Sequence, residues 1–311
     1  MIHHLRSTCA TIAVLLITAW PTHPPLVHAQ DSRPTFKTGV AVVPITAIVR
    51  DSKNRVVRGL ARNDFDVLEN SQPRPIVDFR STDSAPLSVA LLFDTSGSMR
   101  GPNLERGKAV VNALLATLNP AADEVALFTF DKRLRQQTPF TNDVQRVWKA
   151  ADNTDAWGLT SLYDAIADTA KRSATRQHPR RAVIVVTDGL DTSSTLTPSQ
   201  VSGIASSIDV PIYIVAVMAP GWSAEGDEQD GGLSYLAYWT GGDVTRVTTS
   251  DATGRAVGAL MAELRQQYFL AIESAAASGW HRLEVKAKRR DLTVRARGGY
   301  FATPGRTGLG G

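Results

Sequence analysis

Four uninterrupted apolar runs, separated by segments with helical spacing, constrain the fold more than any other feature of this sequence. The runs read LSVALLFD (87–94), DEVALFTF (123–130), RAVIVVTD (181–188) and VPIYIVAV (210–217). Strands that are apolar on both faces belong in parallel sheets covered by helices. The helical segments are residues 102–118, 160–172, 197–208 and 252–267. We therefore predict a doubly wound, mostly parallel α/β sheet over residues 85–267.

The two flanks of this region have a different pattern. Residues 30–84 and 268–302 contain short alternating strands bounded by Gly, Pro, Asn or Asp, which is the signature of strands and turns. A few strands alone are marginally stable in water, so we expect the two flanks to pair. The α/β domain is then inserted in a small β-sandwich-like domain.

The C-terminal flank is strongly basic and raises the sequence pI to about 9.3. Its alternation predicts a hairpin over 283–296, with basic side chains on the solvated face rather than in a nucleic-acid site, because no stacking aromatics interleave. Attraction to acidic cell-surface polymers is an alternative reading. The apolar face would hold Leu283, Val285, Ala287, Leu292, Val294 and Ala296, and the basic face Lys286, Lys288, Arg295 and Arg297.

The first 29 residues read as a secretory signal peptide. A weakly basic start precedes the apolar run CATIAVLLITAW, and Val27 and Ala29 occupy the small-residue positions of a cleavage site. About 12 apolar residues are too few to span a hydrocarbon core, which needs ~20. We expect a mature chain that begins near Gln30, has no transmembrane span, lies in the periplasm or outside the cell, and ends in a flexible tail, 303–311.

Cysteine and histidine usage excludes several kinds of site. The only cysteine, Cys9, precedes the predicted cleavage point, as do four of the six histidines. Thiolate and three-histidine zinc sites are therefore excluded from the mature chain. We expect the two remaining histidines, His178 and His281, at the surface.

Oxygen-bearing side chains follow three of the predicted elements. The first apolar run ends in DTSGS, which supplies Asp94, Ser96 and Ser98; Thr160 stands at a helix start, and Asp188 ends another apolar run. Ligands of open parallel sheets bind at the carboxyl ends of the strands. Carboxylates and hydroxyls are hard ligands for Mg²⁺, Mn²⁺ or Ca²⁺. Together the five residues predict one hard-cation site.

Each feature also has a simpler reading. DTSGS alone is a common helix cap, Thr160 followed by Ser161 and Asp164 reads as a capping segment, and Asp188 alone is a turn residue. The coincidence of all three at one sheet edge favours the metal site.

Four further features near this edge have two readings each. Asp131 and Asp191 are either supports of the site or surface turns, and Trp157 either borders a partner surface or packs in its loop. The acidic loop 221–232 either gates the site or is solvated.

The five positions resemble the metal-ion-dependent adhesion site (MIDAS) of the von Willebrand factor type A (VWA) family, which has the pattern D-x-S-x-S, then a Thr, then an Asp. The flanks GLARNDFDVLENSQPRPIVDF and RQQYFLAI resemble those of secreted bacterial VWFA-related proteins. Leu159 stands where a second Gly is frequent in the family. The resemblance implies a Rossmann-like fold with magnesium bound by Ser96, Ser98 and Thr160, and by Asp94 and Asp188 directly or through water.

The resemblance also implies a function. A partner's Asp or Glu would complete the six-oxygen shell of magnesium, as in a secreted, adhesion-like protein-binding module. It further implies that the helix at 252–267 shifts when the ligand changes. The alternatives are a structural subunit of an envelope assembly with a stabilising cation, and a metal-dependent hydrolase. A hydrolase needs a general base, and no histidine lies near the motifs, so we predict no enzymatic activity. The sequence specifies no oligomeric state.

Overall fold

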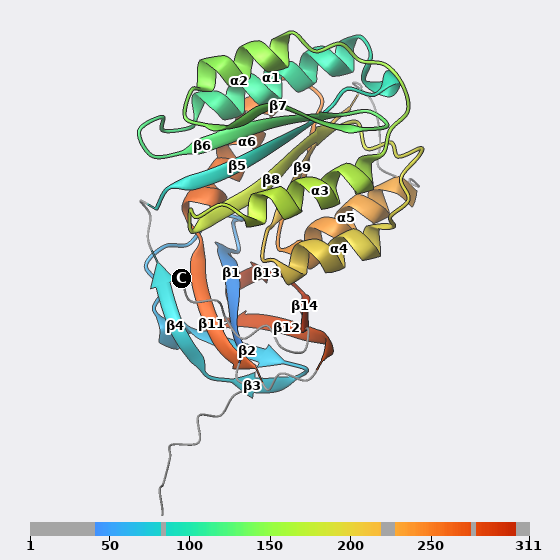
Figure 1. Ribbon diagram of the computed structural model, residues 1–311. Coiled ribbons are helices and arrows are strands. Elements are labelled where there is room, and N and C mark those ends of the chain that lie inside the picture. The colour runs from blue at the N-terminus through green and yellow to red at the C-terminus, as the bar shows by residue number, and fades with distance from the viewer. Residues whose placement is uncertain (1–40, 82–84, 219–227, 275–277, 303–311) are drawn as a thin grey trace, which may run out of the picture. The chain divides into compact units, whose positions relative to one another are not determined.

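The computed structural model describes residues 41–81, 85–218, 228–274 and 278–302 (Figure 1). The described residues form three sheets and six α-helices. The predicted signal peptide, the tail after residue 302 and most of the acidic loop lie outside the described residues. No helix among the described residues is both long enough and apolar enough to span a membrane.

A six-stranded sheet forms the centre of the α/β region, with strand order β10-β9-β8-β5-β6-β7. All neighbours in it are parallel except β7, which runs antiparallel to β6. Every residue of β5 is buried, as its unbroken apolar sequence requires. The predicted fold class is confirmed. The strands are β5 (Leu87–Asp94), β6 (Glu124–Phe130), β7 (Leu134–Thr141), β8 (Arg180–Thr187), β9 (Ile212–Val217) and β10 (Val244–Val247).

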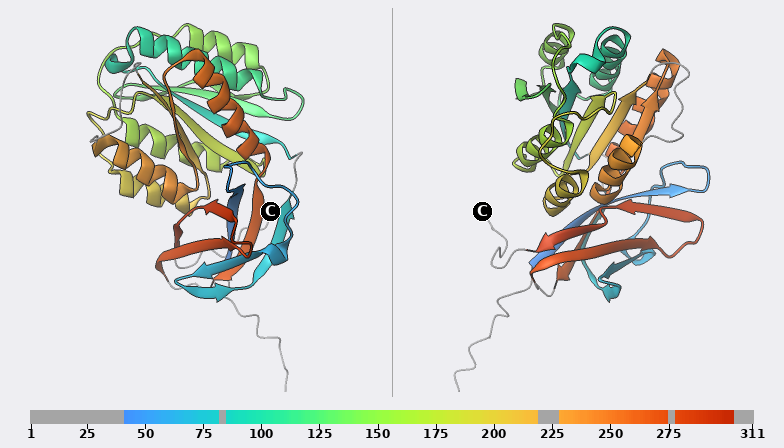
Figure 2. Two further views of the ribbon diagram at one scale, coloured as in Figure 1. Left: turned by 180° about the vertical axis from the view of Figure 1, so that it is seen from behind. Right: turned by 90° about the vertical axis from the view of Figure 1, so that its right-hand side faces the viewer.

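Helices cover both faces of this sheet (Figure 2). Successive side chains of a strand point to opposite faces, so Val89 and Leu91 of β5 pack in one core cluster and Ala90 and Leu92 in the other. The first face is covered by α1 (Pro102–Ala116), α2 (Val144–Asp152) and α6 (Ser250–Arg265), the second by α3 (Leu162–Ala174), α4 (Pro198–Ser207) and α5 (Glu228–Thr240).

The N-terminal and C-terminal strands build two four-stranded sheets together. One has the order β13-β1-β11-β4, in which strands from the two chain ends alternate, and the other has the order β14-β12-β2-β3, in which two C-terminal strands lie beside two N-terminal strands. Side chains of the two sheets share one core around Ile45, Phe65, Tyr268 and Leu283. The strands are β1 (Ala41–Asp51), β2 (Phe65–Glu69), β3 (Gln72–Arg74), β4 (Ile76–Ser81), β11 (Tyr268–Ser274), β12 (Gly279–Ala287), β13 (Leu292–Ala296) and β14 (Gly299–Ala302).

The predicted hairpin over 283–296 is wrong. Strand β12 pairs with β2 and β14, whereas β13 pairs with β1 in the other sheet. The six apolar residues do contribute to one core, but they do so from the two sides of a sandwich. Alternation determines which side chains point inward, and it does not determine which strand is the neighbour.

The predicted solvated basic face is also wrong in part. Lys286 is exposed, whereas Arg297 is only 3% exposed. Its guanidinium donates to the carbonyls of Ser206 and Pro44, and Nε lies 3.4 Å from Asp209 Oδ1. Long-range acceptors therefore offset the burial of this charge.

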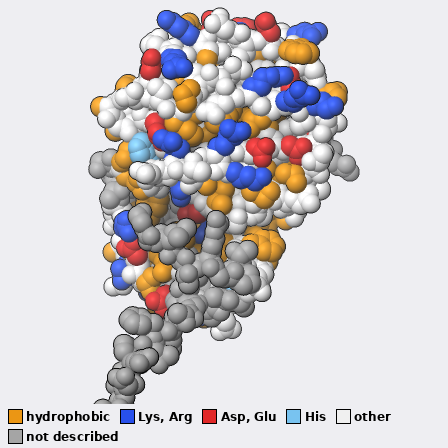
Figure 3. Space-filling view, viewed as in Figure 1, with side chains coloured by type: hydrophobic (Ala, Val, Ile, Leu, Met, Phe, Trp, Pro, Cys, Tyr) orange, Lys and Arg blue, Asp and Glu red, His pale blue; other side chains and the backbone are white. Residues whose placement is uncertain are grey.

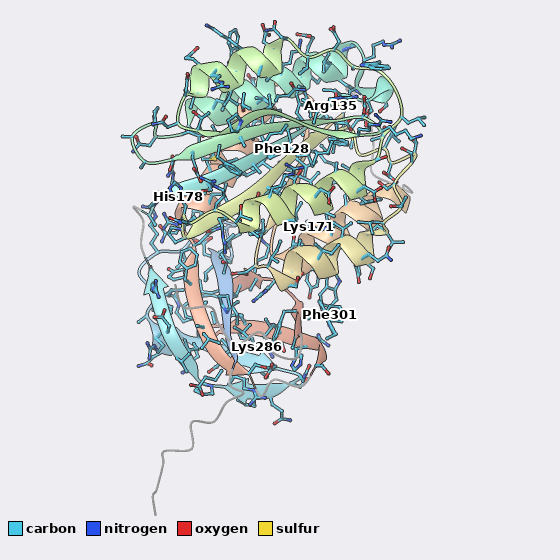
Figure 4. All side chains as sticks on the ribbon, in the orientation of Figure 1. Phe128, Arg135, Lys171, His178, Lys286 and Phe301 are labelled. Carbon is cyan, nitrogen blue, oxygen red and sulfur yellow. The ribbon has the colours of Figure 1, made fainter. Side chains whose placement is uncertain are left out.

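Two other polar residues of this flank are buried or paired. Arg295 pairs with Asp243 at 2.6 Å and with Glu263 of α6. His281 was expected at the surface but is buried, with Nδ1 2.9 Å from Glu69 Oε1. His178, which Figure 4 labels, is half-buried, with 28% of its side chain exposed.

The elements that lack a clear hydrophobic period were not predicted from the sequence. Strand β7 is a polar edge strand that contains Pro139, and edge positions tolerate proline because one side of the strand is unpaired. Helix α5 contains Gly231 and Gly232, which weaken its helical signal. Since α5 begins at Glu228, the end of the acidic segment 221–232 is helical and not a loop. Helix α2 and strand β10 are short, at nine and four residues.

Candidate metal site

The strand order creates a switch point at the carboxyl end of β5. From β5 the chain continues to β6 and β7 on one side, and it then returns to β8, β9 and β10 on the other. Loops diverge at such a point and leave a crevice outside the sheet. Asp94 is the last residue of β5, and Asp188 directly follows β8. The topology therefore brings these two acids to the same edge.

The first site loop is folded around the carboxylate of Asp94. Its Oδ1 accepts a hydrogen bond from the Ser96 N–H at 2.9 Å, and its Oδ2 accepts one from Thr187 Oγ1 at 2.5 Å. The hydroxyls of Ser96 and Ser98 lie 3.1 Å apart. Asp94 and Ser96 are buried, whereas Ser98 is half-buried. The oxygen atoms of this loop therefore extend from the buried Asp94 to the partly exposed Ser98.

Asp188 joins this cluster from the second loop. The Ser98 hydroxyl lies close enough to its carboxylate to favour the ionised form, but burial outweighs this effect and raises the pKa of Asp188. Burial also raises the pKa of Asp94 to about 7, against hydrogen bonds from Thr187 and Ser96, and the charge of Asp188 adds to the rise. The two carboxyls therefore lie close enough to oppose each other's ionisation.

Backbone hydrogen bonds hold Thr160 at the same edge of the sheet. It is 2% exposed, its N–H donates to Thr192 Oγ1 at 2.9 Å, and its carbonyl accepts from the Ser193 N–H at 2.9 Å. Two residues earlier, the Gly158 carbonyl accepts from the Gly97 N–H at 3.0 Å. Gly158 has φ of +88°, a conformation that favours glycine. Asp94, Ser96, Ser98 and Asp188 thus interact through their side chains, whereas Thr160 is held at the same edge of the sheet by hydrogen bonds between loops.

Three acids support these loops. Asp131 is buried, its carbonyl accepts from the Ser161 N–H at 2.9 Å, and its carboxylate pairs with Arg135 at 2.9 Å. Asp191 Oδ1 accepts from the Leu162 N–H at 2.8 Å, at the start of α3. Asp164 does not cap α3 but accepts from the N–H groups of Thr195 and Leu196. Asp131 lies in a turn that its carboxylate caps, but it is buried, and both Asp131 and Asp191 hold the loops of the candidate site by hydrogen bonds.

Thr187 is a site residue that the sequence analysis missed. It ends β8, and its hydroxyl bridges the Asp94 carboxylate and the Gly189 N–H, which lies 3.0 Å away. The only signal was its place directly before Asp188. The hydroxyl-rich segment 191–195, which holds Thr160, was likewise not recognised as part of the site.

The donor chemistry fits a hard divalent cation. The predicted set has two carboxylates and three hydroxyls, and no cluster of three or more His, Cys, Asp or Glu side chains occurs among the described residues. Such a set lacks the nitrogen and sulfur donors that zinc favours and suits Mg²⁺, Mn²⁺ or Ca²⁺. A cation between the two acids would offset the burial of the Asp94 charge and its repulsion by Asp188, which together raise the pKa of Asp94.

Residues 89–190 match the model of the von Willebrand factor type A domain, and all five predicted ligands lie within this range. No curated protein matches the chain.

Three solved structures illustrate the structural similarity. The conserved hypothetical protein BatB from Bacteroides thetaiotaomicron is 20% identical, with a TM-score of 0.49 over 57% of this chain and 98% of that one. The von Willebrand factor type A protein from Catenulispora acidiphila is 12% identical, with a TM-score of 0.49 over 85% and 74%. Proximal thread matrix protein 1 from the mussel byssus, described with a zinc-occupied MIDAS motif, is 17% identical, with a TM-score of 0.46 over 62% and 48%.

Proposed function

We propose that this protein is a metal-dependent protein-binding module whose cation site engages a carboxylate of a partner protein. The observation that carries the proposal is the cluster of Asp94, Ser96, Ser98 and Asp188, whose side chains interact at the switch point of the sheet. The proposed ligands are Asp94, Ser96, Ser98, Thr160 and Asp188, and the proposed cation is Mg²⁺, with Mn²⁺ and Ca²⁺ compatible with the same oxygens.

The burial of the ligands supports an exchangeable outer position. Asp94, Ser96 and Thr160 are buried, while Ser98 and Asp188 are half-buried and open the cluster to solvent. When bound, magnesium provides six positions for oxygen ligands and keeps some for water or for another carboxylate. The buried side chains fix the site, and the exposed side accepts an Asp or Glu from a partner.

The organisation of the chain is part of the proposal. A signal peptide (1–29) precedes the mature protein, which acts in the periplasm or outside the cell. The VWA domain (85–267) is inserted between the N-terminal β segment (30–84) and the C-terminal strands (268–302).

We propose a binding module rather than an enzyme. A hydrolase would need a general base near the cluster. Of the histidines in the described part of the chain, His178 precedes the start of β8, at the opposite end of that strand from Asp188, and His281 lies in β12. Arg135 pairs with the carboxylate of Asp131, and the carboxylate of Asp191 accepts hydrogen bonds from the Leu162 N–H and the Ser194 hydroxyl.

Magnesium titration and capture of native envelope proteins test the proposal together. Calorimetry should show one divalent site in the wild type and none in Asp94→Ala, while an exposed control on α3, Asp168→Ala, binds normally. Capture should fail with EDTA and with Asp94→Ala. Magnesium binding without any EDTA-sensitive partner would favour the structural subunit, and absence of magnesium binding would refute the proposal.

A further inference from the structure

Large exposed apolar side chains lie close in the chain to two of the proposed ligands, Thr160 and Asp188. Trp157 is 61% exposed and Leu159 52%, directly before Thr160, and Leu190 is 36% exposed, two residues after Asp188. The Trp157 N–H donates to the Thr95 carbonyl at 2.9 Å, so this residue is attached to the loop of Asp94. Clustered exposed apolar side chains with polar surroundings mark interaction sites.

A groove of about 450 Å³ extends from Trp157. Trp157 and Asp155 line it on the loop side, Arg135 of β7 lines it on the other, and Thr95 and Gln137 also border it. Thr95 stands between Asp94 and Ser96 in the first site loop, and its hydroxyl donates to the Phe130 carbonyl at 3.0 Å, so the groove lies on the β6 side of that loop. Its lining combines an aromatic side chain with polar groups, which suits a peptide better than a purely apolar ligand.

Positive charge predominates along the rim. Arg100 follows the first site loop, and Lys132, Arg133 and Arg135 follow Asp131; all four are exposed. Figure 3 shows Lys and Arg side chains close together over β7, and Figure 4 places Arg135 there.

Only one of the acids along this rim is both exposed and near the groove mouth. Asp131 is buried and engaged by Arg135 at 2.9 Å, which leaves Asp155 as the exposed acid of the groove lining. A rim of this sign is complementary to a ligand that carries more than one negative charge.

We propose that the ligand is an extended acidic peptide segment of a partner protein. This inference rests on the proposed function: one carboxylate of the segment completes the cation site. A neighbouring large apolar side chain packs on Trp157, and a second acidic side chain faces Arg135. Trp and Arg are the residue types that most often dominate protein–protein binding energy, and here they border one groove. A polyanion without apolar side chains gains nothing from Trp157.

A random peptide library displayed on phage provides the test. The library is bound to the wild-type protein in MgCl₂ and eluted with EDTA. We expect enriched peptides that contain Asp or Glu, a large apolar residue within a few positions, and a second acid. A synthetic peptide of the enriched sequence is then titrated against variants, and magnesium affinity is measured in parallel.

The variants have matched controls elsewhere in the chain. Trp157→Ala should weaken the peptide about tenfold or more without changing magnesium affinity. Its control is Tyr238→Ala, because Tyr238 is 62% exposed near the end of α5. Arg135→Gln should weaken the peptide about threefold and reduce its salt dependence. Its control is Arg55→Gln, because Arg55 forms the same i,i+4 pair, with Asp51.

The outcomes separate this inference from the proposed function. Peptides that share only an acid, with equal affinity for wild type and Trp157→Ala, would overturn the inference and leave the cation site intact. Magnesium binding without any EDTA-eluted peptide would also overturn the inference. A wild-type protein that does not bind magnesium would refute the proposed function itself.

Discussion

Asp94→Asn is expected to stabilise the metal-free protein while it abolishes metal binding. In the folded, metal-free state, burial and the charge of Asp188 raise the pKa of Asp94 from 3.8 to about 7. The unfolded chain therefore ionises at a lower pH than the folded chain. Ionisation of Asp94 opposes folding, and Asn removes this cost.

The magnitude follows from linkage. A raised folded-state pKa leaves stability unaffected below pH 3.8, lowers it as pH rises to about 7, and leaves a constant cost above that value. At about 1.4 kcal/mol per pKa unit, the cost is about 4 kcal/mol at pH 8 and about 1.5 kcal/mol at pH 5. The stability difference between Asp94→Asn and wild type should therefore grow by about 2.5 kcal/mol from pH 5 to pH 8. Other effects of the amide cancel in this comparison.

Urea denaturation in EDTA at the two pH values measures the effect, with Asp168→Asn, an exposed carboxylate on α3, as the background. With magnesium at about 100 times its dissociation constant, the wild type should gain about 2.7 kcal/mol, and Asp94→Asn should gain far less. A stability difference that does not change with pH would refute the electrostatic reasoning. Equal stabilisation of both proteins by magnesium would refute the role of Asp94 as a ligand.

Two predictions concern buried charges outside the site. Arg297→Ala should lower the free energy of unfolding by about 3–5 kcal/mol, because Asp209, whose side chain is only 10% exposed, loses its cation. The exposed Lys286→Ala should cost less than about 0.5 kcal/mol, and equal effects of the two substitutions in urea denaturation would contradict this. Burial opposes ionisation of Glu69, but hydrogen bonds from Ser274 and Tyr300 and nearby positive charge outweigh it and lower its pKa below 4.5. The ionised Glu69 therefore contributes its full stabilisation above pH 4.5, and this is lost as the pH falls through the lower pKa of the folded state. Glu69→Gln should make the free energy of unfolding less dependent on pH in this acidic range. An unchanged dependence on pH would contradict the prediction.

The local hydrophobic pattern was sufficient to predict elements that consist almost entirely of apolar residues. The run 87–94 could only be a buried central strand, and Asp94 at its end predicted where ligands gather. Pairing over long distances was not predictable in the same way. The acids that contact Arg295 and Arg297 lie at 209, 243 and 263, far from both arginines in the sequence. An alternating basic pattern gives no sign of them and reads as a solvated face.

The candidate site shows the same division. Each predicted ligand was found from its place after a strand or at a helix start. Thr187 was not, because a threonine within a strand is also an ordinary β-sheet residue. Its role depends on a 2.5 Å hydrogen bond to Asp94, which is 93 residues away.

One route for a signal from the site to the β-sandwich runs through helix α6, and the contacts of this helix set the cost of that signal. Glu263, in its last turn, is buried and pairs with Arg50 of β1 and Arg295 of β13. Arg265 pairs with Asp123, which also accepts from the Leu87 N–H at the start of β5. A shift of the helix along its axis would break these buried pairs, and breaking one is costly unless new partners replace it. If the helix shifts as the sequence analysis expects, the β-sandwich must move with the C-terminal end of α6, because a slide past fixed arginines would leave the buried Glu263 without its partners.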